Sequence, residues 1–222
     1  IRSNALQGLY LAGVAVDANR VVSNTVDSGS SGTLQNRGIY IGNGDRNTIT
    51  NNLVRGNSQF GVNMDNTASS NNVRGNMIMS NGLYGVNLNG ADVDANVIAA
   101  NSIDGKGLQH TGVYIVDGDA NVVMGNTVFG NTNVGISIAG SGASNLISGN
   151  LVRSNRAGVE SRGILISGVG ADANRIVSND VHGAGFQTYG ILQAWGTGNT
   201  ISNNRIRRQS FAGVGFFNGS GP

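Results

Sequence analysis

Four side chains that can donate, accept or stabilise a proton lie in one short stretch of the sequence: Lys106, His110, Tyr114 and Asp117. Histidine, lysine and tyrosine serve as general acids and bases. A nearby cation stabilises the enolate-like charge that forms when a proton leaves a carbon next to a carboxylate. We therefore treat these four residues as candidate catalytic residues for proton abstraction. The competing interpretation is that they are ordinary surface residues.

A second group of residues has the chemistry of sugar binding. Tyrosine rings stack on the flat faces of sugars, and asparagine amides hydrogen-bond to hydroxyl groups. Residues of suitable types recur two and four positions after a repeated glycine, at Tyr40, Asn63, Asp65, Asn87 and Asn89. The pattern predicts a sugar-binding surface, and a plain solvated sheet face is the alternative.

The elements that position these residues are marked by a repeated pair of asparagines, five residues apart. Successive pairs begin 24 to 29 residues apart, at Asn19/Asn24, Asn47/Asn52, Asn71/Asn76, Asn96/Asn101, Asn121/Asn126, Asn145/Asn150, Asn174/Asn179 and Asn199/Asn204. We assign Asn4 to a further pair as its second member. Stacked amides can hydrogen-bond between repeats, and asparagine tolerates the left-handed backbone of a sharp bend. Both columns are therefore predicted to be structural.

Aliphatic residues and glycines form further columns. A Val or Ile stands two residues after each first Asn, and a Val, Ile or Leu stands two residues after each second Asn. We place Ile1 in the first of these columns and Leu6 in the second. A third segment opens with a glycine followed by alternating apolar residues, at Gly8, Gly38, Gly61, Gly85, Gly112, Gly135, Gly163, Gly190 and Gly213. Period-two alternation between Gly and Asn boundaries predicts three short strands per repeat.

Three short strands in each repeat, without a helical pattern, predict that each repeat is one coil of a parallel β-solenoid. Parallel connections are overwhelmingly right-handed, so we predict an all-β fold, a right-handed parallel β-helix of about nine coils. At roughly 4.8 Å per coil it would be about 40 Å long. We expect residues 1–222 to form one domain. Neither end carries a capping segment, so we expect an excerpt of a longer chain or end-to-end, homo-oligomeric association.

The composition argues against several classes of protein. The 222 residues include 36 Gly and no Cys, and only 12% are charged. The missing cysteines exclude disulfide scaffolds and thiolate metal sites. The net charge of +2 is scattered, so nucleic acid is not an expected partner. No apolar run reaches the roughly 20 residues of a membrane span.

A repeated Asp-Ala-Asn triplet is the feature that comes nearest to a metal motif. It begins at Asp17, Asp94, Asp119 and Asp172. Its spacing does not supply the six to eight oxygens that calcium takes, so a role in turns is favoured. We predict no metal and no cofactor.

The run Gly38-Ile39-Tyr40-Ile41, followed by Asn47-Thr48-Ile49-Thr50-Asn51-Asn52, resembles the repeats of the pectin-lyase-like superfamily. That superfamily includes pectate lyases, polygalacturonases, alginate lyases, mannuronan epimerases and phage tailspikes. The resemblance covers nearly the whole chain and implies the fold. It also implies that substrate lies in a groove across the strand that begins with the column glycine.

The resemblance carries no known active site onto this chain. Mannuronan epimerases have an Asp-Pro-His element on the groove strand, whereas the sole proline here is Pro222. The acidic cluster of a pectate lyase is also missing. A polygalacturonase-like site would need several aspartates on neighbouring coils, and only Asp65 and Asp117 lie near the groove.

Long segments between a second Asn and the next glycine border the predicted groove, at 24–38, 101–112, 150–163 and 179–190. Insertions in a solenoid concentrate on a binding face. The third of these segments carries Arg153, Arg156, Glu160 and Arg162, for which local salt bridges and binding of an anionic glycan are both open interpretations.

Together these patterns predict an extracellular or cell-surface β-helix that binds an acidic polysaccharide. Whether it also processes that polysaccharide, as a lyase or epimerase, is left open by the sequence. The alternative is a non-catalytic structural solenoid, such as a fibre, stalk or tailspike shaft. Titratable residues clustered over the third to fifth coils favour an enzyme, whereas an even spread favours a shaft.

Overall fold

The computed structural model describes residues 1–13, 15–29, 35–155 and 161–217. In these residues the regular structure consists of strands that pair in parallel, with no helix. No helix long and apolar enough to span a membrane occurs in these ranges either. The predicted all-β class is confirmed.

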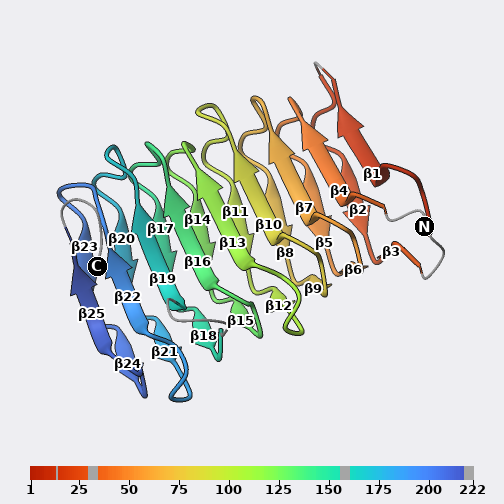
Figure 1. The fold of residues 1–222 in the computed structure, drawn as a ribbon. Helices are drawn as coiled ribbons and strands as arrows, with labels where there is room; N and C mark the ends of the chain where they lie inside the picture. The colour runs from red at the N-terminus through yellow and green to blue at the C-terminus, as the bar shows by residue number, and fades with distance from the viewer. Residues whose placement is uncertain (14, 30–34, 156–160, 218–222) are drawn as a thin grey trace.

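The longest strands form one sheet, here called the long-strand sheet. Its strands are β1 (Gln7–Ala12), β4 (Arg37–Gly42), β7 (Phe60–Asp65), β10 (Tyr84–Asn89), β13 (Thr111–Val116), β16 (Val134–Ala139), β19 (Arg162–Ser167), β22 (Tyr189–Gln193) and β25 (Ala212–Phe216). They pair in this order along the axis of the molecule, from red to blue in Figure 1. Each begins at or next to a glycine of the predicted column.

Three-residue strands form the other two sheets. The second sheet consists of β2 (Arg20–Val22), β5 (Thr48–Thr50), β8 (Asn72–Arg74), β11 (Val97–Ala99), β14 (Val122–Met124), β17 (Leu146–Ser148), β20 (Arg175–Val177) and β23 (Thr200–Ser202). The third sheet consists of β3 (Thr25–Asp27), β6 (Leu53–Arg55), β9 (Met77–Met79), β12 (Ser102–Asp104), β15 (Thr127–Phe129), β18 (Leu151–Arg153), β21 (Asp180–His182) and β24 (Arg205–Arg207).

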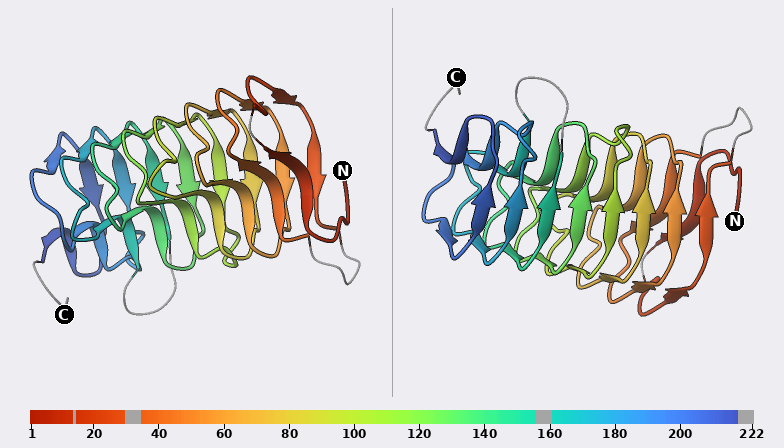
Figure 2. Two further views of the ribbon diagram at one scale, coloured as in Figure 1. Left: turned by 90° about the horizontal axis from the view of Figure 1, so that it is seen from above. Right: turned by 90° about the horizontal axis from the view of Figure 1, so that it is seen from below.

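Each coil takes one strand from each sheet before the chain moves to the next coil. In the described residues, strands β1 to β24 make eight such coils, and β25 begins another. Figure 2 shows the stacked coils from two sides, with the first strands (red) and the last strands (blue) at opposite ends of the solenoid.

The core is a set of stacked aliphatic columns. The predicted column residues, among them Ile49 and Val54, are fully buried in the inner coils. The glycine column exists because the backbone of the long-strand sheet approaches the core side chains closely. A Cβ atom at Gly61 would lie 2.5 Å from the carbonyl oxygen of Gly85 and 2.6 Å from Cγ2 of Ile78. No side chain fits there without displacing backbone.

The paired asparagines form two hydrogen-bonded ladders, as predicted. Asn76 Nδ2 donates to Asn101 Oδ1 at 3.0 Å, and the Asn76 backbone N–H donates to the same oxygen at 2.9 Å. The expectation that these asparagines adopt the left-handed conformation is wrong. The residue before the ladder asparagine does so instead, for example Ala100, with φ 52°, before Asn101.

A third amide ladder precedes the long-strand sheet, and the sequence analysis missed it. Side-chain amides connect Gln35, Asn57, Asn81, Gln109 and Asn131 in successive coils. The glutamines stand three residues before the column glycine and the asparagines stand four residues before it. The longer side chain compensates for the shorter segment. Because the residue type and the spacing change together, the column does not stand out in the sequence.

The N-terminal residues lie one ladder further along the coil than predicted. Asn4 donates to Gln35 Oε1 at 3.1 Å, so it belongs to the third ladder and not to the second Asn column. Arg2 pairs with Asp27, which places Ile1 beside strand β3. Leu6 is exposed and takes no place in a core column. The assignment of Ile1, Asn4 and Leu6 to the repeat was wrong because it assumed two amide ladders per coil, whereas the structure has three.

The Asp-Ala-Asn triplets act in turns. The carboxylate of Asp94 accepts the backbone N–H of Asp119 at 2.7 Å, and Asp119 in turn accepts the N–H of Ala143 at 2.7 Å. These bonds tie each turn to the next coil. Within the ranges that the structure describes, no three His, Cys, Asp or Glu side chains come together to hold a metal ion.

Candidate functional site

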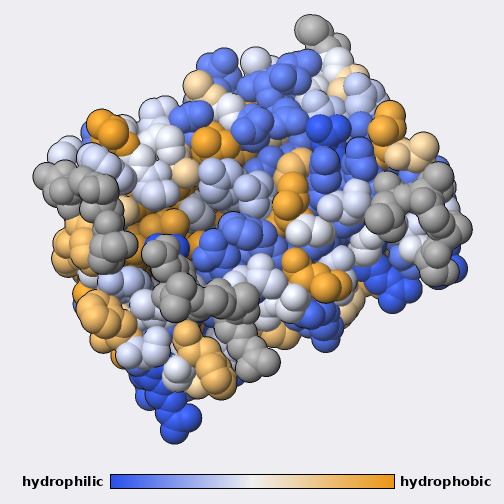
Figure 3. All heavy atoms as spheres, in the orientation of Figure 1, coloured by the Kyte–Doolittle hydropathy of each residue, from blue (hydrophilic) through white to orange (hydrophobic). Residues whose placement is uncertain are grey.

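The predicted sugar-binding residues lie together on the outside of β4, β7, β10 and β13, here called the polar face. The parallel register places Tyr40, Asn63, Asn87 and Tyr114 in one row across the four strands. Asp65 and Asn89 stand side by side in the next row. In the space-filling view of Figure 3, hydrophilic residues cover most of the middle of the molecule, with single hydrophobic residues between them.

A hydrogen-bonded network joins the polar side chains of β7 and β10. The Asp65 carboxylate accepts from Asn63 Nδ2 at 2.7 Å and from Asn89 Nδ2 at 2.9 Å. Asn87 Nδ2 donates to Asn63 Oδ1 at 2.5 Å. Asn63 is 0% exposed and Asn87 is 4% exposed, whereas Asn89 is exposed and Asp65 is half-buried. Asn63, itself bonded by Asn87, therefore holds Asp65 in place, and Asp65 and Asn89 are the groups that solvent reaches.

Aromatic rings flank this network. Tyr10 stacks on Tyr40 with a centroid distance of 5.3 Å, and the guanidinium carbon of Arg37 lies 4.9 Å from the Tyr40 ring centroid. Tyr84, at the start of β10, has its ring centroid 5.5 Å from that of Phe60 and 4.6 Å from that of Tyr114 on the next strand, β13. The polar network is therefore bordered by an aromatic group on each side.

Sequence reasoning did not single out Arg37, Phe60 or Tyr84. They occupy the position immediately before the column glycine, where the side chain also points outward. Reading that position along the repeats would have found them. Tyr84 is central, because Phe60, Tyr114 and His110 all contact its ring.

Burial changes the acidity of the tyrosines on this face. Desolvation raises the pKa of Tyr84 above its usual value. Burial raises the pKa of Tyr114 as well, with smaller contributions from Tyr84 and from the Asp117 carboxylate. The pKa of Tyr40 is raised by burial and by the Asp65 carboxylate. All three phenols are therefore neutral at neutral pH and can donate a proton or a hydrogen bond.

His110 reaches this aromatic group from the turn before β13. Its ring lies 6.2 Å from that of Tyr84. His110 Nε2 lies 3.0 Å from the Asn133 side-chain amide nitrogen, and Nδ1 lies 3.0 Å from Thr111 Oγ1. An amide N–H can only donate, so Nε2 accepts and Nδ1 carries the proton. Both ring nitrogens are engaged in this arrangement.

Lys106 and Asp117 have partners outside the aromatic group. Lys106 Nζ lies 2.7 Å from the carboxylate of Asp104, on strand β12 of the third sheet. Asp117, at the end of β13, accepts from the backbone N–H and the hydroxyl of Ser141 at 2.8 and 3.1 Å. The structure thus gathers His110 and Tyr114 around Tyr84, with Asp117 near enough to influence Tyr114. Lys106 lies in the turn after β12, where Asp104 of the third sheet holds it.

Two of the four predicted insertions lie partly outside the described residues. Arg156 and Glu160, which were considered for local salt bridges or anionic glycan binding, lie outside the described residues. The other two insertions form tight turns, in which Gln109 and Gln187 donate their backbone N–H to the carbonyl oxygens of Gly105 and Gly183.

The sequence profile of the family described as "Right handed beta helix region" matches residues 1–152 and 69–206. The chain belongs to this right-handed β-helix family. The match confirms the predicted right-handed β-helix. No curated protein is similar enough in sequence to count as a relative of this β-helix.

Several solved structures share the fold of this β-helix. The periplasmic alginate epimerase AlgG has a TM-score of 0.61 and 15% identity over 82% of this chain and 47% of its own. The Dettilon tailspike protein gp208 has a TM-score of 0.64 and 18% identity over 81% of this chain and 38% of its own. The alginate lyase of Paenibacillus sp. str. FPU-7 has a TM-score of 0.60 and 15% identity over 93% of this chain and 87% of its own.

Identities this low establish a common fold and nothing about activity. The β-helix spans less than half the length of the epimerase and of the tailspike.

Proposed function

We propose that this β-helix binds an acidic polysaccharide along the polar face of β4, β7, β10 and β13. The observation that carries the proposal is the Asp65 carboxylate, fixed by the Asn63 amide, beside an exposed Asn89 amide and between two aromatic groups. A rigid acceptor and donor pair suits sugar hydroxyls, and the half-buried rings of Tyr40 and Tyr114 offer flat surfaces for sugar rings.

The acidic character of the ligand is inferred from Arg37. Its guanidinium lies over the Tyr40 ring, and it forms no ion pair with any residue in the described ranges. Its buried Nε also lacks a hydrogen-bond partner. An arginine held in this way presents its outer N–H groups to a carboxylate. Two of the proteins with a similar fold are named for acting on alginate, which is a polymer of uronates.

Lyase- or epimerase-type processing is a second candidate function, and the group of Tyr84, Tyr114 and His110 favours it. Tyr114, with its raised pKa, would be the proton donor to a leaving oxygen. His110 would serve as base only after its Nε2 releases the hydrogen bond from the Asn133 amide and turns to the substrate. Lys106, the predicted cation for stabilising an enolate, is instead paired with Asp104. We therefore rank binding first. A non-catalytic shaft remains the alternative to both.

We also infer a location outside the cytoplasm, at the cell surface or in the medium, where such polysaccharides occur. The similar alginate epimerase is described as periplasmic.

Calorimetric titration with alginate, pectate and polygalacturonate tests binding, with dextran as the neutral control. Tyr114→Ala and Arg37→Gln should each weaken binding of the acidic polymers by about tenfold, because each removes one buried or oriented contact worth roughly 1.4 kcal/mol. Arg74→Gln, an exposed arginine on β8 of the second sheet, should bind like the wild type. Wild-type affinity in both Tyr114→Ala and Arg37→Gln would rule out this face.

The ultraviolet absorbance of unsaturated uronate products tests the lyase activity in the same samples. Proton NMR of the incubated alginate reports epimerisation. Binding without either signal assigns the chain a binding role alone, and no binding by any of the polymers favours the shaft.

A further inference from the structure

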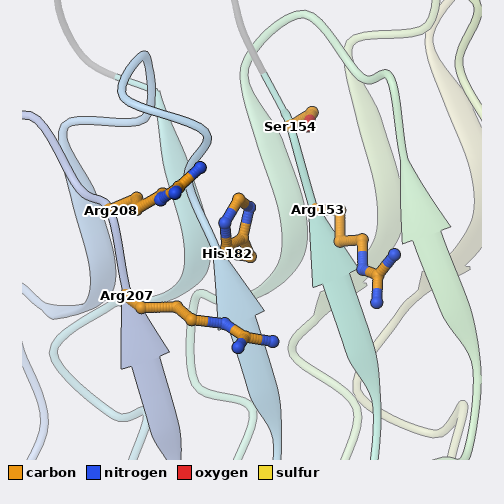
Figure 4. Close-up of a pocket in the computed structure, with 5 residues that line it drawn as sticks. All are labelled: Arg153, Ser154, His182, Arg207 and Arg208. Carbon is orange, nitrogen blue, oxygen red and sulfur yellow. The ribbon is translucent and has the colours of Figure 1, made fainter.

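A basic hollow lies on the third sheet, away from the polar face. Its volume is about 650 Å³, and Arg153, Ser154, His182, Arg207 and Arg208 line it. Figure 4 shows the imidazole of His182 between the side chains of Arg208 and Arg153, with the guanidinium group of Arg207 beneath it. Arg207 and Arg208 extend toward the strand that carries His182.

The parallel register of the third sheet creates this group. Arg153 pairs with His182, and His182 pairs with Arg207, on the successive strands β18, β21 and β24. Side chains in such a row stand about 4.8 Å apart, so each is the direct neighbour of the next. Arg208 follows in a left-handed conformation, with φ 55°, and adds a second guanidinium from the turn.

The row that contains Arg153, His182 and Arg207 continues along the third sheet, and its other charged side chains form ion pairs. Asp27 and Arg55 stand in this row on β3 and β6, and their side chains form an ion pair at 2.8 Å. Asp104 pairs with Lys106 at 2.7 Å. At the hollow, not every charged side chain has an oppositely charged partner among the described residues. Arg207 donates to the Asp180 carboxylate at 2.8 and 3.2 Å, but Arg153 and Arg208 form no ion pair with any residue that the structure describes.

Like charges side by side in one row destabilise a sheet unless a counter-charge is present. Among the residues that the structure describes, the three arginines and Asp180 leave two positive charges without a partner. Arg207 Nε is buried and also lacks a hydrogen-bond partner. The arrangement therefore has unused donors as well as unused charge.

We propose that this hollow binds a phosphate group, either as inorganic phosphate or as a phosphate ester. Planar guanidinium groups match the oxygens of a phosphate, and the Ser154 hydroxyl and the His182 ring add further hydrogen-bonding groups. A phosphate monoester carries about −1.5 to −2 charges at pH 7, which matches the unpaired charge of the hollow. A single uronate carboxylate would leave one of these arginines unmatched. The site is independent of the polysaccharide proposed for the polar face.

Calorimetric titration of the whole chain with inorganic phosphate and with glucose 6-phosphate tests the proposal, at constant ionic strength in chloride buffer. Arg153→Gln and Arg208→Gln should each weaken phosphate binding by about tenfold, the loss of one charge-assisted contact. Arg175→Gln is the matched control, because Arg175 is an exposed arginine on β20 of the second sheet. Arg207 is left unchanged, since it also pairs with Asp180.

Glucuronate and sulfate are the comparison ligands. Tighter binding of glucose 6-phosphate than of inorganic phosphate supports an ester as the ligand, and equal binding supports free phosphate. The proposal is overturned if glucuronate or sulfate binds as tightly as phosphate. It is also overturned if phosphate gives no heat, or if Arg153→Gln and Arg208→Gln both bind like the wild type. Because these variants leave Arg37 and Tyr114 intact, failure here is distinct from failure of polysaccharide binding.

Discussion

Asn126 and Asn150 are joined twice across neighbouring coils. The side-chain Nδ2 of Asn126 lies 3.0 Å from Oδ1 of Asn150, and its backbone nitrogen lies 2.9 Å from the same oxygen. Asn126 Nδ2 also donates to the carbonyl oxygen of Ile98 at 2.8 Å. One buried amide thus satisfies backbone groups at a bend, where the strands themselves supply no partner.

Replacing Asn126 by Leu should strongly destabilise the fold. The substitution leaves the N–H groups of Asn101 that bond to Asn126 Oδ1 without an acceptor, and each unpaired buried group costs about 1–3 kcal/mol. Thermal and urea unfolding measure the loss. Asn72→Thr is the control, because Asn72 Oδ1 is buried without a partner and the neighbouring strand carries Thr48 at that position. Equal melting temperatures for Asn126→Leu and the wild type would contradict the ladder role.

Glycine at position 61 is required by close backbone approach, so Gly61→Ala should destabilise the protein by about 1–3 kcal/mol through overpacking. Gly213→Ala is the matched substitution in the same column. Among the described residues, a Cβ there meets only Ile206 Cγ2, at 3.7 Å, so the change should be nearly neutral. Urea unfolding of the two variants side by side checks the contrast. Equal losses of stability would show that steric crowding is not the cause.

The third ladder should be sensitive to side-chain length. Gln109 Nε2 donates to Asn131 Oδ1 at 2.7 Å from a position three residues before Gly112. In Gln109→Asn the amide falls one methylene short, and we expect a loss of about 1–3 kcal/mol from the unpaired buried amides. Gln59→Asn shortens a glutamine outside the ladder and should be neutral. Calorimetric melting that ranks the two variants the other way would refute the length argument.

The raised pKa of Tyr84 and of Tyr114 should make stability fall at alkaline pH. Their pKa values are higher in the folded protein than in the unfolded chain, mainly because of burial. Their contribution to stability is therefore complete below the unfolded pKa of about 10, and it is lost as the pH rises through the folded pKa. Melting temperatures measured from pH 8 upward should decline above pH 10 in the wild type.

The double variant Tyr84→Phe/Tyr114→Phe should show a shallower decline, because neither phenol remains to ionise. Tyr10→Phe removes an exposed phenol and serves as the control. An alkaline profile of the double variant that coincides with that of the wild type would assign the decline to other groups.

The solenoid could be predicted from the sequence because each repeat contains the residue types that one coil requires. A ladder asparagine such as Asn121, an aliphatic residue such as Val123 and a column glycine such as Gly135 each satisfy one local requirement of a coil. Those requirements recur with every turn of the chain. A coil also contacts mainly the coils before and after it, so the period in the sequence is the period in space.

Only the tertiary structure decided what the outward side chains do. Asn63 and Asn87 occupy the predicted face, yet their neighbours exclude solvent from them. Lys106 pairs with Asp104, and His110 reaches across to Asn133 in the next coil. The arginine row of the hollow arises from strands in three different coils. The position of an inward side chain follows from the residues of its own repeat. The surroundings of an outward side chain depend on the sizes and charges of residues in the coils on both sides, and no single repeat contains that information.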